Sequence, residues 1–225
     1  MAYDTPMRES TIVTPRGWWD LADAAAFYPT DLPEDWRLGY FANQFGASLL
    51  PWNSWQNAAP TLRAQWLGDV APGFRFIAEA GPGSAERETQ ATLQQALGAS
   101  LYAWLAHSGG FEPQAPDLQA RRNADGSSDR LACWRVDAGS GRESGTTHER
   151  QPGSTGDGRA HRAPDSYGVI ARQTLHQDLR AARSWLEGLS IVNGRPPTVV
   201  ILASPSSKTL ETWLQLIELL GLESD

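Results

Sequence analysis

Short apolar strands alternate with amphipathic helices along this chain, and this alternation constrains the fold more than any other feature. Residues 198–203 (TVVILA) form an uninterrupted apolar run, which is typical of a strand buried on both faces of a parallel sheet. Stripes of apolar side chains at helical spacing precede and follow it, over residues 174–189 and 208–220. This order predicts parallel strands with helices packed on the outside.

The first hundred residues repeat the same pattern. We predict strands over residues 10–14, 47–50 and 74–80, and helices over residues 34–45, 61–70 and 84–97. The runs 100–106 and 130–137 are further strand candidates, although periodicity alone does not distinguish the first from a helix. About six strand candidates result outside the predicted flexible loop.

One long segment departs from this pattern. Residues 138–166 carry six glycines and almost no large apolar side chain, so they bury too little area to offset the entropy of ordering them. We therefore expect a flexible loop there, at which limited proteolysis should cut. Residues 112–129 have a similar but less extreme composition. The length of 225 residues otherwise fits a single α/β domain spanning 1–225.

Charge and composition exclude several functional classes. The formal net charge of −7 argues against nonspecific binding to a phosphate backbone, so nucleic acid is not an expected partner. The N-terminal segment is polar and no apolar run approaches the length of a membrane span. The single cysteine, Cys133, cannot form an internal disulfide. These features predict a cytoplasmic protein without a membrane partner.

Polar and indole side chains cluster where three of the predicted strands end. Carboxyl ends of neighbouring parallel strands share one edge, so these side chains are expected to converge on a ligand site. Indole rings beside an amide and carboxylates suit a sugar or a base. The group consists of Trp18, Asp20, Asn53, Trp55 and Glu79. Glu79 is the candidate general acid or base; alternatively, the tryptophans pack the core and rim, and Glu79 is a solvated strand end.

A second candidate site lies at the start of the last predicted helix. Small hydroxyl residues at a helix N-terminus can hold a phosphate through backbone N–H groups. The residues concerned are Ser206, Ser207, Lys208 and Thr209, and Lys208 is the only lysine in the chain. The glycines of a nucleotide-binding P-loop are absent, because Leu202 and Ser207 stand in their places. A weak phosphate site and simple helix capping are both open.

No pattern points to a metal, a cofactor or a covalent nucleophile. The histidines stand at positions 107, 148, 161 and 176, without the spacing of any metal-binding motif. Cys133 lies within a predicted strand beside Trp134, which is typical of a buried structural thiol. We therefore predict no metal and no cofactor.

The scaffold segments of the chain resemble a known family. Residues 27–36 (FYPTDLPEDW) match the pattern Phe-Tyr-Pro-x-x-Leu-Pro-x-x-Trp, and residues 60–76 contain Pro-x-Leu-x-x-x-Trp followed by Pro-Gly-Phe-Arg-Phe. With Gly17-Trp18, these motifs are similar to the YecE-like family, a TIM-barrel domain of unknown function. The resemblance covers about half of the chain. It implies an α/β, TIM-barrel-like (β/α) parallel barrel. A complete TIM barrel has eight strands, and the sequence offers fewer candidates. The barrel is therefore incomplete, or two strands lie within 100–137.

The departures from the family fall on polar residues at strand ends. The family's Glu before Asn53-Ser54 is Pro51 here, its Lys after the third strand is Glu79, and its Glu-x-Arg-His segment has no counterpart. The carboxyl-terminal strand ends carry the chemistry of TIM barrels. The resemblance therefore implies a divergent, shortened and non-catalytic binding domain for a sugar-like or phosphorylated small molecule. A hydrolase or isomerase that uses Glu79, and a protein-interaction module, are the alternatives; the oligomeric state is open.

Overall fold

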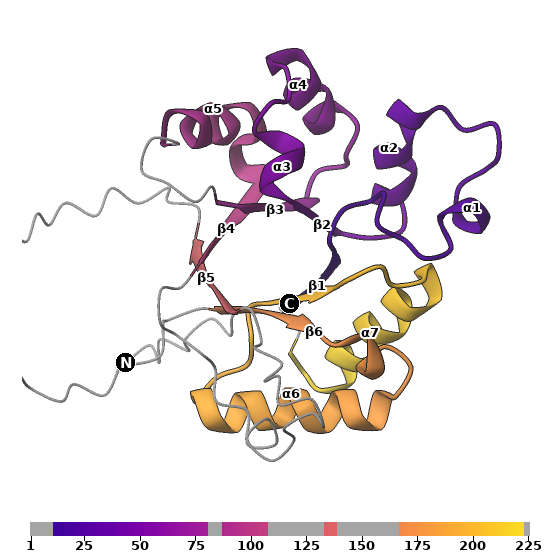
Figure 1. Cartoon of the computed structure of the whole chain (residues 1–225), viewed down its shortest axis with the longest axis vertical. Coiled ribbons are helices and arrows are strands. Elements are labelled where there is room, and N and C mark those ends of the chain that lie inside the picture. Colours follow the sequence, from indigo (N-terminus) through magenta and orange to yellow (C-terminus); the bar gives the residue numbers. More distant parts are fainter. Residues whose placement is uncertain (1–10, 81–86, 108–132, 139–166, 223–225) are drawn as a thin grey trace, which may run out of the picture.

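The computed structural model describes residues 11–80, 87–107, 133–138 and 167–222 (Figure 1). Within them, one seven-stranded sheet runs in the order β1-β7-β6-β5-β4-β3-β2. The strands are β1 (Ile12–Pro15), β2 (Ala47–Leu50), β3 (Arg75–Glu79), β4 (Leu101–His107), β5 (Cys133–Ala138), β6 (Tyr167–Ala171) and β7 (Val199–Leu202).

The sheet consists of two parallel groups joined by one reversed strand. Strands β2, β3 and β4 pair in parallel, as do β6, β7 and β1, while β5 pairs antiparallel with both β4 and β6. The α/β class with parallel strands is thus confirmed, but the expectation that every strand would be parallel is wrong at β5. A parallel connection needs a packed crossover, and the connecting sequences 108–132 and 139–166 lack the apolar stripe of a crossover helix.

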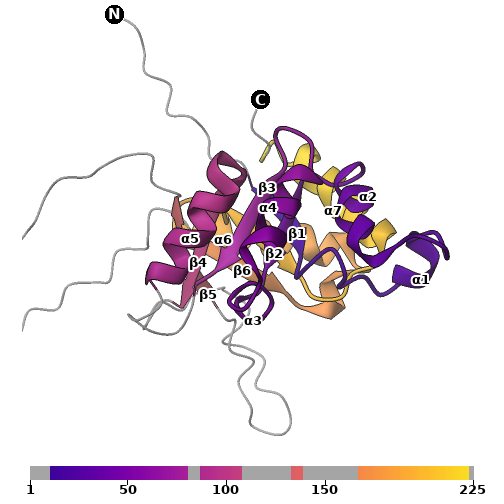
Figure 2. The same cartoon turned by 90° about the horizontal axis from the view of Figure 1, so that it is seen from above.

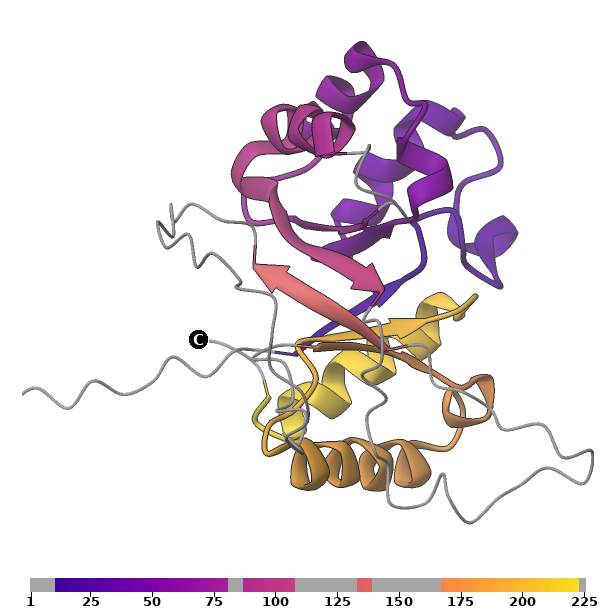
Figure 3. The same ribbon diagram turned by 60° about the vertical axis from the view of Figure 1, so that its left-hand side comes forward.

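The helices lie between or after the parallel strands. They are α1 (Ala24–Phe27), η1 (Glu34–Trp36), α2 (Arg37–Ala42), α3 (Trp52–Trp55), α4 (Pro60–Gly68), α5 (Arg87–Leu97), η3 (Gly98–Ser100), η4 (Gln173–Leu175), α6 (Leu179–Asn193) and α7 (Ser207–Leu219). Figure 3 shows α6 and α7 on the side of β6 and β7, and α4 and α5 on the side of β3 and β4. The short α1 stands away from the sheet (Figure 2) and buries none of its residues.

Local signals in the sequence fix the ends of the longer helices. Pro60 opens α4, where its missing N–H costs nothing. Asp178 caps α6 by accepting the backbone N–H of Ala181 at 2.9 Å, and Gly194 ends this helix with a φ of 72°. Because of this cap, α6 begins later than the predicted start at residue 174, and residues 173–175 form the short η4 instead.

The two faces of the sheet are covered in different ways. Outward side chains such as Phe76 and Val200 pack with the helices in the main core. Inward side chains form a separate buried cluster, and in the described part of the chain it contains strand residues alone. Its buried members are Ile12, Ala47, Leu49, Ile77, Ala103, Leu105, Val199 and Ile201. A sheet face that no helix covers must be covered by the sheet itself, so the sheet is strongly curled.

The curled sheet brings its two edge strands together without a backbone ladder. Strands β1 and β2 lie side by side, and the buried hydroxyl of Thr14 donates to the carbonyl of Ala47 at 3.3 Å. The ladder order nevertheless begins at β1 and ends at β2, so the sheet is not a closed barrel. Within the described residues, no helix is long and apolar enough to cross a membrane. Of the predicted flexible loop at 138–166, Ala138 is the last residue of β5, and residues 139–166 lie outside the described ranges.

Candidate functional site

The carboxyl-terminal edge of the parallel strands brings the predicted site residues into one region. All strands except β5 run in one direction, so the segments that follow them emerge at the same edge. The candidates lie in the β1–α1 segment, in α3, at the start of α7 and at the last residue of β3. The contacts of these residues define what each of them does.

Glu79, the candidate general acid or base, fastens α3 to the end of β3. Its Oε2 accepts the backbone N–H of Trp52 at 3.0 Å. Its main-chain carbonyl accepts the indole Nε1–H of Trp55 at 3.1 Å. Pro51, at the N-cap position of α3, makes no side-chain cap, so the carboxylate of Glu79 satisfies a helix N–H that lacks a partner within its own helix. The glutamate therefore serves as a capping group supplied from a neighbouring strand.

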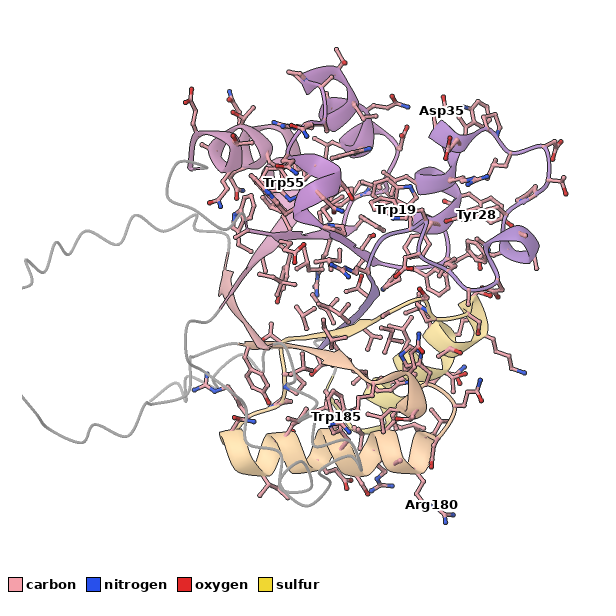
Figure 4. The ribbon with its side chains drawn as sticks, in the orientation of Figure 1. Trp19, Tyr28, Asp35, Trp55, Arg180 and Trp185 are labelled. Atoms are coloured by element: carbon pink, nitrogen blue, oxygen red, sulfur yellow. The ribbon has the colours of Figure 1, made fainter. Side chains whose placement is uncertain are left out.

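The other two candidates on this side have different surroundings. Trp55 is fully buried, with its ring 4.6 Å from that of Trp52 and 5.5 Å from that of Trp104, both edge to face. Asn53 is exposed, and its Oδ1 accepts the hydroxyl of Ser54 at 3.4 Å. Figure 4 shows Trp55 at α3, apart from Trp19 on the side of α2. Trp55 is thus a core residue, while Asn53 remains open to solvent at the rim.

Two aspartates of the β1–α1 segment each accept two hydrogen bonds from the β7–α7 segment, and each of these pairs of bonds is called a clamp below. Asp20 accepts the backbone N–H of Ser204 at 3.0 Å and its hydroxyl at 2.6 Å. Asp23 accepts the backbone N–H of Ser207 at 2.8 Å and its hydroxyl at 2.7 Å. Ser204 has a φ of 45°, a conformation that costs a non-glycine residue about 1 kcal/mol. The paired bonds from Asp20 hold that residue in place.

These clamps also occupy the proposed phosphate site. The N–H of Ser207 is bound to Asp23, and the N–H of Thr209 donates to the side chain of Ser206 at 3.1 Å. Ser206 is thus the N-cap of α7, which supports the capping alternative. Lys208 is exposed. The chain's own carboxylate therefore takes the place that an anion would need at this helix N-terminus.

Trp18 belongs to the core beneath the edge. It is 8% exposed, and its ring lies 5.8 Å from that of Trp66. The hydroxyl of Tyr28 donates to the carbonyl of Trp18 within the buried region. Burial raises the pKa of this tyrosine far above its ordinary value, and the charge of Arg37 offsets only part of that rise. Trp18 and Tyr28 thus hold the β1–α1 segment against the helices.

Trp19, which our site prediction left out, is the exposed indole of this edge. It is 40% exposed, although its ring stands edge to face with that of Trp18 at 4.4 Å. Its other support is Gly17: a Cβ at position 17 would lie 2.6 Å from Cε2 of Trp19 and 2.7 Å from Cζ2. The available sequence signal was therefore the glycine two residues earlier, which lets the ring rest on the main chain.

His176 is the remaining polar side chain of note. It follows β6, is buried, and has no hydrogen-bond partner for its Nε2 within the described structure. Burial lowers the pKa of His176, and a hydrogen bond to the backbone of Ala171 partly offsets this. No group of three or more metal-ligating side chains occurs in the described ranges. His148 and His161 lie outside them.

Comparisons with protein-family models, curated proteins and solved structures find no match for this chain. The likeness to the YecE-like family therefore rests on the quoted motifs alone.

Proposed function

We propose that the chain is a degenerate, TIM-barrel-like domain of the YecE-like type that binds a small molecule without catalysing a reaction. The ligand lies at the carboxyl-terminal edge of the parallel strands. One observation carries the proposal: Asp20, Asp23 and Glu79 each accept a backbone N–H from a neighbouring segment. The carboxylates that could supply acid–base chemistry thus serve to position loops.

A structural hydrogen bond limits the chemistry that a carboxylate can perform. A general base must reach the proton that it abstracts, at about 2.6–3.2 Å. A carboxylate that caps a helix is held by its main-chain donor and cannot turn toward a substrate without exposing that donor. Segments fastened in this way form a rigid surface, and rigid support is what a binding site needs.

Features of the sheet support the barrel-like part of the proposal. The inward cluster of strand residues, with Leu49 and Ile77 fully buried, corresponds to the packed interior of a small barrel. The contact between Thr14 and Ala47 joins the first two strands where a barrel would close. The reversed β5 and the missing β1–β2 ladder are the degenerate features.

Catalysis by Glu79 is the second candidate, and one observation favours it. Within the described residues, the Oε1 atom of Glu79 accepts no hydrogen bond, because the Trp52 N–H donates to Oε2 and the Trp55 indole donates to the main-chain carbonyl. A free carboxylate oxygen that is partly buried beside Trp52 could still reach a ligand proton.

Glu79→Gln separates the two candidates, because its amide oxygen can still accept the Trp52 N–H. Wild type and variant are assayed for hydrolysis of aryl glycosides and aryl phosphates, with binding followed by ligand-observed NMR on methyl glycosides and phosphate esters. The proposal predicts no turnover by either protein and equal binding by both. A wild-type turnover that Glu79→Gln abolishes at an unchanged melting temperature would overturn it. Glu34→Gln, exposed in η1, is the control.

A further inference from the structure

The proposed function leaves open which residue contacts the ligand and what the ligand is. From the geometry of the β1–α1 segment, we infer that the exposed indole face of Trp19 is a stacking platform for an uncharged pyranose ring. This inference rests on the proposed function, because it places the ligand at the same edge. It goes further in naming the contact residue and the chemical class.

Trp19 is supported on two sides yet remains open to solvent. The main chain at Gly17 lies under the ring so closely that any Cβ there would overlap it, at 2.6–3.0 Å from three ring atoms. The ring of Trp18 stands against it at 4.4 Å with an interplanar angle of 79°. An indole held in this way loses little conformational freedom when a ligand stacks on it, and preorganisation of this kind raises affinity.

Exposure alone does not make an indole a stacking platform, and Trp36 provides the comparison. Trp36 is 63% exposed in η1, but no ring contact is found for it within the described residues. It also has no glycine beneath it, since Glu34 and Asp35 precede it. Trp36 is therefore an exposed indole without support, and it provides a matched control.

Two carboxylates that follow Trp19 closely in the sequence bear on the class of ligand. Asp20 and Asp23 lie one and four residues beyond it, and each already accepts two hydrogen bonds from the β7–α7 segment. Their oxygens keep further lone pairs and can accept hydroxyl protons, but they repel a phosphate. A pyranose offers a face of C–H groups to the negative face of an indole and hydroxyl donors at its rim. An uncharged sugar ring meets both requirements.

The test follows the indole N–H signal of Trp19 in ¹H–¹⁵N NMR spectra, assigned by its disappearance in Trp19→Phe. Methyl glucopyranoside and methyl galactopyranoside are titrated into the full chain, with adenosine and glucose phosphate as competing classes. We expect a pyranoside to shift the Trp19 signal and leave that of Trp36 in place. Trp19→Ala should weaken binding by about tenfold or more, Trp19→Phe by less, and Trp36→Ala should have no effect.

Gly17→Ala adds a readout that keeps the indole but moves it. Its new Cβ displaces the ring, so pyranoside binding should weaken while the melting curve confirms a folded protein. If Trp19→Ala binds the pyranoside with wild-type affinity, Trp19 is not part of the binding site, and the proposed function is unaffected. A Trp19 shift caused by adenosine or glucose phosphate but by neither pyranoside would make the sugar class wrong. If no pyranoside shifts the signal, the inference fails, whereas the proposed function is decided separately by Glu79→Gln.

Discussion

Substituting Asp20 by alanine tests the clamp between the first and last helical segments. The change removes two hydrogen bonds at once, to the backbone N–H of Ser204 at 3.0 Å and to its hydroxyl at 2.6 Å. Hydrogen bonds to a charged group contribute roughly 1.5–3 kcal/mol each. Ser204 is exposed and Asp20 is only partly buried, so solvent screening reduces this total. We expect Asp20→Ala to lower the free energy of unfolding by about 2 kcal/mol.

Thermal and urea unfolding measure this loss directly. For a domain of 225 residues, about 2 kcal/mol lowers the melting temperature by roughly 4–8 °C. A double-mutant cycle with Ser204→Ala isolates the hydroxyl bond and should give a coupling free energy of about 1 kcal/mol. Asp31→Ala is the control, because Asp31 is exposed. An Asp20→Ala protein as stable as wild type, or a strictly additive cycle, would refute the clamp.

Three further substitutions test the burial of particular side chains. Burial raises the pKa of Tyr28 far above its ordinary 10.0, so unfolding releases a proton at alkaline pH. The free energy of unfolding therefore falls as the pH rises above 10. In urea unfolding measured at several pH values, Tyr28→Phe should abolish this part of the fall. Burial lowers the pKa of His176 below 6.5, so the unfolded state takes up a proton first as the pH falls. The free energy of unfolding therefore decreases below pH 6.5. His176→Asn should reduce this decrease, and NMR titration of the imidazole should show the lowered pKa directly. Leu49→Ala in the inward cluster should cost about 2–5 kcal/mol in urea unfolding, whereas a cost below about 1 kcal/mol would mean that the inner face of the sheet is not a packed core.

The regular part of the fold was predictable because its signals are local. Apolar runs and helical stripes placed six of the seven strands, since burial on a sheet or under a helix imposes a short period on the sequence. The strand β6 (YGVIA) was not predicted: it is short, contains Gly168, and directly follows a polar, glycine-rich stretch. The reversed direction of β5 was also missed, because no periodicity within a strand encodes the direction of its neighbour.

The position of the candidate residues at the ends of the strands was predictable from the sequence, but their contacts were not. Parallel strand ends converge, and this placed Asp20, Asn53 and Glu79 at one edge. The partner of Asp20 is Ser204, 184 positions away, and their contact depends on the pairing of β1 with β7. The two adjacent tryptophans differ for a similar reason. Burial of Trp18 and exposure of Trp19 follow from the course of the main chain after Gly17. The amino-acid composition does not reveal that course.

The central claim is that the strand-end carboxylates are structural, and the stability of Glu79→Ala tests it most directly. This substitution removes the bond from Oε2 to the Trp52 N–H and leaves the first turn of α3 with an unpaired donor. We expect the free energy of unfolding to fall by about 1–2 kcal/mol, measured by urea unfolding beside Glu34→Ala, whose side chain is exposed. A Glu79→Ala protein as stable as wild type would contradict the account, because the carboxylate would then be free for chemistry.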